Sequence, residues 1–222
     1  MPPFTGEQFL AVFLEYNSAV WPASTLAYGL GILALVVVLW PKPVWSKVTA
    51  SILAMMWAWT GVAYHGIFFS TINSAAILFA ALFVAQALAF IHFGSIKNQL
   101  SFGEVKGPQA LIGWVFIAYA GVAYQLIGLH AGHSYEELPQ FGTTPCPVTL
   151  FTFGILLLAK PPWILLVIPV IWSLIGGSAA LLLSVPQDWL LLASGVITIA
   201  LLISSKSKPG HSMTKEFDLG KQ

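Results

Sequence analysis

About seven apolar stretches, separated by short polar segments, account for most of the 222-residue chain. A hydrocarbon core of about 30 Å requires about 20 apolar residues in each helix that crosses it. Charged residues make up only 8% of the sequence, against about 25% in soluble domains. We therefore expect an all-α, polytopic membrane helical bundle of about seven transmembrane helices. The predicted spans are residues 23–40, 47–69, 72–93, 109–129, 147–159, 161–184 and 189–204.

Two flanking segments differ from this bundle. Residues 1–22 contain a capping box, Thr5 with Gln8, followed by apolar residues at helical spacing, which predicts a short amphipathic helix in the membrane interface. No lysine precedes the first apolar stretch, so we do not expect a cleavable signal peptide. Residues 205–222 are polar and are predicted to be a disordered cytoplasmic tail. The predicted domains are thus 1–22, a single bundle over 23–204, and the tail.

The positive charges predict the orientation of the bundle. The sequence contains nine lysines and no arginine. Under the positive-inside rule they indicate an outer N-terminus and a cytoplasmic C-terminus. The lysines fall in alternate loops and in the tail, at positions 42 and 47, 97 and 106, 160, and 206 onwards. The absence of arginine and of G-x-x-x-x-G-K-[ST] or G-x-G-x-x-G motifs argues against nucleic-acid and nucleotide partners.

The fifth predicted span is unusually short. Residues 147–159 would form a helix of about 20 Å at a rise of about 1.5 Å per residue. It can cross a membrane only if residues 141–146 also lie at membrane depth, where irregular backbone must be buried in protein or line a wet cavity. No acidic residue falls inside any predicted span, which argues against a proton-coupled antiporter.

The predicted topology brings several potential metal ligands to the outer side. Cys146, His130 and His133 form the core of this set, and His65 and Glu136 are possible further ligands. Imidazole, carboxylate and thiolate groups bind Zn or Cu, and a thiolate also binds Hg. Pro147 suits the first turn of a helix and would place Cys146 at the N-cap, where the helix dipole favours a thiolate. The alternatives are polar residues at a helix end and a small buried cysteine.

Polar residues inside the spans suggest a pocket facing the bundle interior. They would line a polar pocket that opens toward the His and Cys residues, or form hydrogen bonds between helices. The sequence Gly-Val-Ala-Tyr occurs at residues 61–64 and again at 121–124, which is consistent with an internal repeat. The predicted pocket residues are Trp57, Thr60, Tyr64, Gln86, Tyr124 and Gln125.

Three functions fit these features. The first is binding of a transition-metal or thiophilic ion (Zn, Cu or Hg) at the outer face, for transport or sensing. The second is a membrane-embedded enzyme that uses a metal or Cys146 to act on a lipid or small apolar substrate. The third is a non-catalytic assembly partner, as a homo-oligomer or with another membrane protein. Binding without catalysis is the preferred expectation.

Three segments carry a family resemblance: FTGEQFLAVFLEYNSAVWP near the N-terminus, WTGVAYHGIFF, and FGTTPCPVTLFTFG. Together they resemble an uncharacterised family of multi-pass bacterial membrane proteins, a domain of unknown function that is sometimes labelled a transporter permease. The resemblance covers nearly the whole chain. It implies a multi-pass protein of the bacterial inner membrane and supplies no reaction, substrate or site residue.

Overall fold

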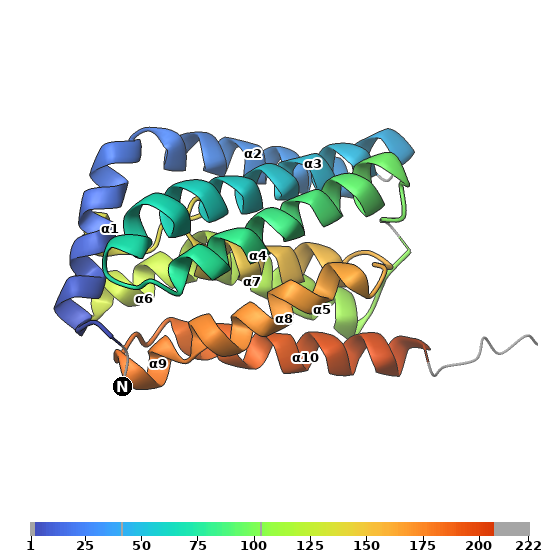
Figure 1. Ribbon diagram of the computed structural model, residues 1–222. Helices are drawn as coiled ribbons and strands as arrows, with labels where there is room; N and C mark the ends of the chain where they lie inside the picture. Colours follow the sequence, from blue (N-terminus) through green and yellow to red (C-terminus); the bar gives the residue numbers. More distant parts are fainter. Residues whose placement is uncertain (1–2, 41, 103, 207–222) are drawn as a thin grey trace, which may run out of the picture.

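The computed structural model describes residues 3–40, 42–102 and 104–206, and the regular elements in this part of the chain are all helices. Most of them run side by side along one direction, while the first crosses an end of the bundle (Figure 1). The all-α prediction is therefore confirmed. The helices are α1 (Gly6–Val20), α2 (Ala23–Leu39), α3 (Pro43–Trp59), α4 (Ala76–Ala89), α5 (Pro108–Ala118), α6 (Tyr124–His130), α7 (Pro145–Leu157), α8 (Ile164–Gly177), α9 (Ala179–Leu182) and α10 (Asp188–Lys206).

Short π-helical and 3-10 segments extend or join these helices. The π-helical segment η1 (Thr60–Phe68) and the 3-10 turn η2 (Phe69–Thr71) continue α3. Two further π-helical segments, η3 (Phe90–Ile96) and η4 (Tyr119–Ala123), continue α4 and connect α5 to α6. A 3-10 turn, η5 (Tyr135–Glu137), follows α6.

Four continuous helices among the described residues are long and apolar enough to cross a membrane. The pair α1 and α2, bent by 82°, adds a fifth if it is counted as one span, and α7 and α10 are shorter apolar helices. Each predicted span overlaps a helix of the structure, but by length and composition alone only four or five qualify as crossings. The four are Pro43–Thr71, Ala76–Ile96, Pro108–His130 and Ile164–Leu182.

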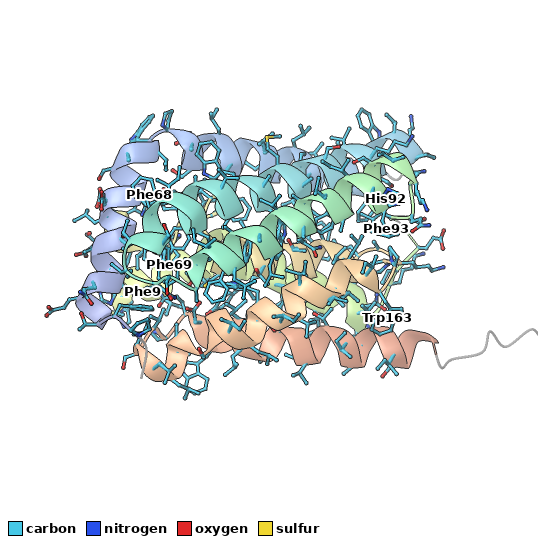
Figure 2. All side chains as sticks on the ribbon, in the orientation of Figure 1. Phe9, Phe68, Phe69, His92, Phe93 and Trp163 are labelled. Carbon is cyan, nitrogen blue, oxygen red and sulfur yellow. The ribbon has the colours of Figure 1, made fainter. Side chains whose placement is uncertain are left out.

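The sides of the bundle carry large apolar side chains that no other helix covers. Leu26 is 66% exposed, Leu78 62%, Leu111 64% and Val196 66%. Many more project from the flanks (Figure 2). Apolar surface of this extent is unfavourable in water, at about 25 cal/mol for each Å². It suits a bundle that is surrounded by lipid.

Helix α1 packs its apolar face onto the end of the bundle. It opens with the predicted capping box, in which the Thr5 side chain accepts from the backbone N–H of Gln8 and the Gln8 side chain accepts from that of Thr5. The Phe13 ring stacks on Tyr64 with a centroid distance of 5.1 Å. The segment predicted to be helical thus forms a helix over Gly6–Val20, and its place in the membrane interface stays a prediction. The residues after 206 in the predicted tail lie outside the described part of the chain.

Helix α7 is the centre of the bundle, and all of its residues are buried. Two glycines allow α5 to approach it closely, because a Cβ on Gly154 would lie 2.6 Å from Cγ1 of Ile117, and a Cβ on Gly113 would lie 2.9 Å from the carbonyl oxygen of Gly154. The irregular backbone over residues 138–144 is also buried. A helix enclosed by others can be short, because its neighbours shield it on all sides.

Candidate functional site

The first turn of α7 meets the first turn of α10 in a buried polar cluster. Cys146 is 4% exposed and Asp188 is 1% exposed. The thiol donates to Oδ2 of Asp188 at 3.8 Å, and the hydroxyl of Tyr124 donates to Oδ1 at 2.6 Å. A buried carboxyl group must be hydrogen-bonded to offset its loss of hydration, and these two donors do so. We call Cys146, Asp188 and Tyr124 the thiol–carboxyl cluster.

The position of Cys146 differs from the prediction in one respect. Helix α7 begins at Pro145, with Thr144 as its N-cap, so Cys146 is the second helical residue rather than the cap. Pro145, which has no N–H, occupies the first position. The neighbouring group is a carboxyl and the thiol acts as its hydrogen-bond donor, so this environment does not hold the thiolate that the sequence predicted.

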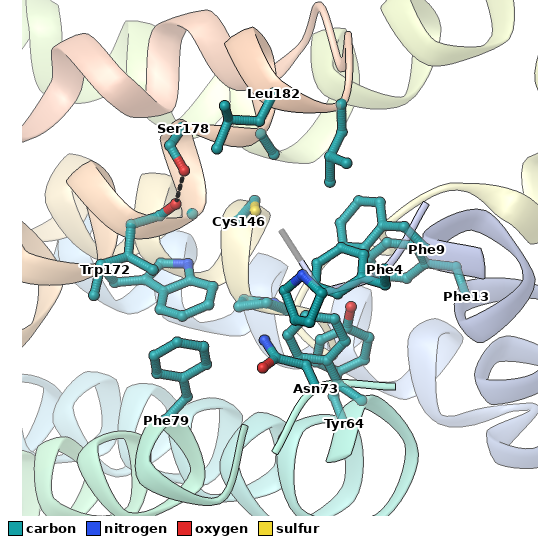
Figure 3. Close-up of a pocket in the computed structure, with 17 residues that line it drawn as sticks. Phe4, Phe9, Phe13, Tyr64, Asn73, Phe79, Cys146, Trp172, Ser178 and Leu182 are labelled. Atoms are coloured by element: carbon teal, nitrogen blue, oxygen red, sulfur yellow. Dashed lines mark hydrogen bonds between the residues drawn. The ribbon is translucent and has the colours of Figure 1, made fainter. Parts of the chain in front are cut away.

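An aromatic pocket adjoins this cluster (Figure 3). Its volume is about 160 Å³, and Cys146 forms part of its wall. The indole N–H of Trp172 faces the thiol and has no hydrogen bond of normal geometry within the described part of the chain, although Trp172 is only 6% exposed. We call this cavity the aromatic pocket. It is lined by Pro3, Phe4, Phe9, Phe13, Tyr64, Phe69, Asn73, Phe79, Pro145, Cys146, Trp172, Ile175, Gly176, Ser178, Ala179, Leu182 and Leu183.

Both copies of the Gly-Val-Ala-Tyr sequence adjoin this site in equivalent local structure. The first lies in η1 and the second spans η4 and the start of α6, so each coincides with π-helical backbone. Each ends in a tyrosine that is at most 1% exposed: Tyr64 lines the pocket and Tyr124 binds Asp188. π-helical turns redirect side chains and are frequent at functional sites. The glycines differ, since a Cβ on Gly61 would lie 2.9 Å from Cβ of Phe83, whereas Gly121 has open space.

A hydrogen-bond chain fixes α1 beside the pocket. The indole of Trp59 donates to the hydroxyl of Tyr16 at 2.8 Å, and this hydroxyl donates to the carbonyl oxygen of Thr143 at 2.7 Å. Asn17 donates to the carbonyl oxygens of Glu136 and Leu138, at 2.7 and 3.0 Å. These bonds join α1, which contributes Phe9 and Phe13 to the pocket wall, to α3 and to the segment that precedes α7.

His65 lies beside the pocket in an aromatic enclosure. Its side chain is fully buried, and neither ring nitrogen has a hydrogen-bond partner among the described residues. The imidazole centroid is 4.6 Å from that of Phe83 and 4.9 Å from that of Trp172. Trp172 therefore stands between His65 and the thiol of Cys146, and it contacts both.

The other predicted metal ligands lie apart from this site. His130, the last residue of α6, and Glu136 are exposed, and His133 is half-buried in the turn after α6. Cys146 is enclosed elsewhere by α8 and α10. Among the described residues, no three His, Cys, Asp or Glu side chains come close enough to hold a metal ion. The five predicted ligands are thus not brought together, and metal binding stays a prediction.

All six predicted pocket residues are buried, and three of them form hydrogen bonds between helices. Trp57 donates to the Thr152 hydroxyl at 2.8 Å, and Gln86 donates to the carbonyl oxygen of Leu165 at 3.0 Å. Within its own segment, the Thr60 hydroxyl donates to the carbonyl oxygen of Met56. The remaining three are Tyr64, which lines the aromatic pocket, Tyr124, which binds Asp188, and Gln125, which donates to the carbonyl oxygen of Pro139.

Two site residues escaped the sequence analysis. Asp188 directly precedes the last predicted span and was assigned no role, although an acid is favoured in the first turn of a helix. No acid falls inside a predicted span, but Asp188, one residue before the last of them, is buried in the structure. Trp172 lies within an apolar stretch, and nothing in the sequence distinguishes it from a lipid-facing tryptophan.

Among known proteins, the chain matches one family model. The model of a family of unknown function (DUF6064) matches residues 6–212, which is nearly the whole chain. Neither a curated protein nor a solved structure matches the chain significantly. The matched region includes the thiol–carboxyl cluster and every lining residue of the aromatic pocket except Pro3 and Phe4. The chain therefore belongs to this family of unknown function.

Proposed function

We propose that this chain is a seven-span protein of the bacterial inner membrane, with its N-terminus outside and its C-terminus in the cytoplasm. In this arrangement the enclosed α7 and the shorter α10 complete the crossings. The support is the apolar flank and the separation of charge between the two ends of the bundle. Reporter fusions after residue 71, which is outside under this topology, and after residue 206 test the topology. Cytoplasmic activity at both positions, or at neither, would contradict it.

Within this bundle, the aromatic pocket binds a small, mostly apolar ligand next to the thiol–carboxyl cluster. The observation that carries this proposal is the buried indole N–H of Trp172, which faces Cys146 at the wall of a mostly apolar cavity and has no hydrogen bond of normal geometry among the described residues. A cavity of about 150 Å³ accommodates a molecule of the size of benzene. Aromatic walls would supply the affinity, and the few polar groups would orient one acceptor atom of the ligand.

The single cysteine allows this proposal to be tested directly, because any thiol label reports on Cys146 alone. In purified protein we expect neutral N-ethylmaleimide to react with this thiol much faster than a cationic methanethiosulfonate. Saturating 1-hexanol, used as the probe, is expected to slow the maleimide reaction about tenfold. Intact-mass spectrometry measures both rates. Labelling that hexanol does not slow would contradict the proposal.

A matched pair of variants localises the effect. Ile175 lines the pocket and Ile171 lies one helical turn away outside it, and both are 40% exposed. Ile175→Trp fills the pocket and is expected to slow labelling and to abolish hexanol protection. Ile171→Trp adds the same side chain to the same helix and should leave the labelling rate and the hexanol protection unchanged. Equal effects of the two variants would show that hexanol acts through the surrounding detergent.

Binding of a thiophilic ion is the second candidate function. The buried thiol of Cys146 favours it, since a thiolate is the ligand that soft ions prefer, and the adjacent carboxyl group of Asp188 offers a second donor atom. Metal content measured after loading with Hg, Cu or Zn tests this candidate in wild type, Cys146→Ser and Asp188→Asn. Stoichiometric metal that is lost in both variants supports it. Retention of the metal in both variants would show that the ion binds at another part of the chain.

A further inference from the structure

A second cavity lies at the end of the bundle opposite to α1. It has a volume of about 340 Å³ and is formed where the segment before α5 meets the segment between α7 and α8. Trp163, which belongs to its wall, lies at the same end as His92 and Phe93 and far from Phe9 (Figure 2). We call it the basal cavity. Its lining residues are Glu104, Val105, Lys106, Gln109, Ala159, Lys160, Pro161, Trp163, Leu166 and Leu202.

The charges of the bundle are segregated, and the basal cavity lies at the positive end. The five lysines with described side chains all lie at helix ends on this side, whereas the glutamates at positions 7, 15, 136 and 137 belong to the α1 end (Figure 1). Glu104 is the one acid of the described residues at the lysine end. These lysines are Lys42, Lys47, Lys97, Lys106 and Lys160.

Two of these lysines border the cavity in a fixed local structure. Phe102 forms a β-bridge with Ala159, and the backbone N–H of Lys160 donates to the carbonyl oxygen of Ser101 at 3.3 Å. Glu104 forms an ion pair with Lys160, with both side chains more than half exposed. Lys106 is exposed and has no ion pair among the described residues. The rim of the cavity thus carries a net positive charge.

The deeper wall of the cavity is apolar, and it continues onto the side of the bundle. Leu166 and Leu202 are at most 6% exposed and form this wall. Next to it, Leu111 near the start of α5, Ile164 at the start of α8 and Ile203 near the end of α10 are 64%, 47% and 52% exposed. A ligand with an anionic head and apolar chains could therefore occupy the rim and the flank together.

From this combination we infer that the basal cavity binds the phosphate-bearing headgroup of an anionic phospholipid, with Lys106 and Lys160 as the cationic contacts. The acyl chains lie on the apolar flank, and the ring of Trp163 covers the boundary between head and chains. Basic pockets between membrane helices on the cytoplasmic side commonly hold such headgroups. The inference rests on the proposed membrane topology but not on the aromatic pocket.

Native mass spectrometry of the full chain in mild detergent tests this inference, with phosphatidylglycerol and phosphatidylcholine as probes. Phosphatidylglycerol is expected to bind at least about tenfold more tightly. Lys106→Gln with Lys160→Gln should remove most of this preference. Lys42→Gln with Lys47→Gln is the matched control, because it removes the same charge from exposed lysines at the same end but outside the cavity. The control should retain the preference.

The outcomes separate the possible sources of binding. Equal loss in the two double variants would mean diffuse attraction and would overturn the inference, as would equal binding of the two lipids to wild type. Displacement of the lipid by inorganic phosphate at similar concentrations would assign the site to a free anion and overturn the lipid assignment. Glu104→Gln removes the opposing carboxylate and is expected to tighten phosphatidylglycerol binding two- to threefold. If the wild-type protein does not prefer phosphatidylglycerol while 1-hexanol still protects Cys146, the lipid inference is wrong and the proposal for the aromatic pocket stands.

Discussion

The start of α7 and the end of α6 lie at the same end of the bundle, and both carry residues that could bind a metal. At the start of α7, Cys146 is covered by other helices and its polar neighbours come from α6, α8 and α10. At the end of α6, His130 is exposed and the chain turns through Gly132 with a φ of 96°. Enclosure by several helices, rather than proximity in the chain, brings polar groups together.

The largest expected effect falls on the enclosed side of this comparison. Asp188→Ala leaves the Tyr124 hydroxyl and the Cys146 thiol without an acceptor in a buried position. We expect a loss of about 2–3 kcal/mol in the free energy of unfolding, measured in mixed micelles. Asp188→Asn keeps an acceptor oxygen and should lose less. Glu136→Ala, on the exposed side, should change stability by less than about 0.5 kcal/mol. Equal effects of Asp188→Ala and Glu136→Ala would remove the distinction between the two regions.

A smaller effect, of opposite sign, is expected at His65. Its imidazole is surrounded by aromatic rings and has no hydrogen bond among the described residues. Burial of its two nitrogen atoms therefore costs free energy that no hydrogen bond offsets. Phenylalanine occupies a similar volume without polar atoms. His65→Phe should therefore raise the free energy of unfolding by about 1 kcal/mol. A loss of stability of that size would show that the imidazole has a partner, such as an ordered water molecule, and would extend the polar cluster to His65.

The smallest effect is expected in the turn after α6. His130→Ala combined with His133→Ala removes an exposed side chain and a half-buried one. Stability should change by less than about 0.5 kcal/mol, and 1-hexanol should protect Cys146 to the same extent as in wild type. The same labelling and unfolding assays measure both quantities. Weaker protection in the double variant would connect the two regions that the structure separates.

The sequence was sufficient to predict most of the helices, because apolar length and composition determine where a membrane helix can form. The capping box of Thr5 and Gln8 identified the start of α1, and the short fifth span pointed to an enclosed α7 with buried backbone before it. Length and composition give only four or five crossings among the described residues, because α7 and α10 are too short to qualify and α1 and α2 qualify only as a bent pair.

The site was predicted less well, because its members meet only through the packing of distant helices. Cys146 and Asp188 are 42 residues apart, and Tyr124 is 64 residues from Asp188. Such contacts depend on the rotation of each helix about its axis, which composition does not specify. The predicted topology selected the correct end of the bundle for Cys146, but it could not distinguish the enclosed residues from the exposed histidines at the same end.

Ligand binding in the aromatic pocket is tested most directly by a crystal structure of the protein grown with 1,6-dibromohexane, in which the anomalous signal of bromine locates the ligand. We expect a bromine peak inside the aromatic pocket, in contact with Trp172 and Cys146, that disappears in Ile175→Trp and persists in Ile171→Trp. Bromine peaks confined to the outer flank of the bundle, with none in the pocket of the wild-type protein, would contradict it.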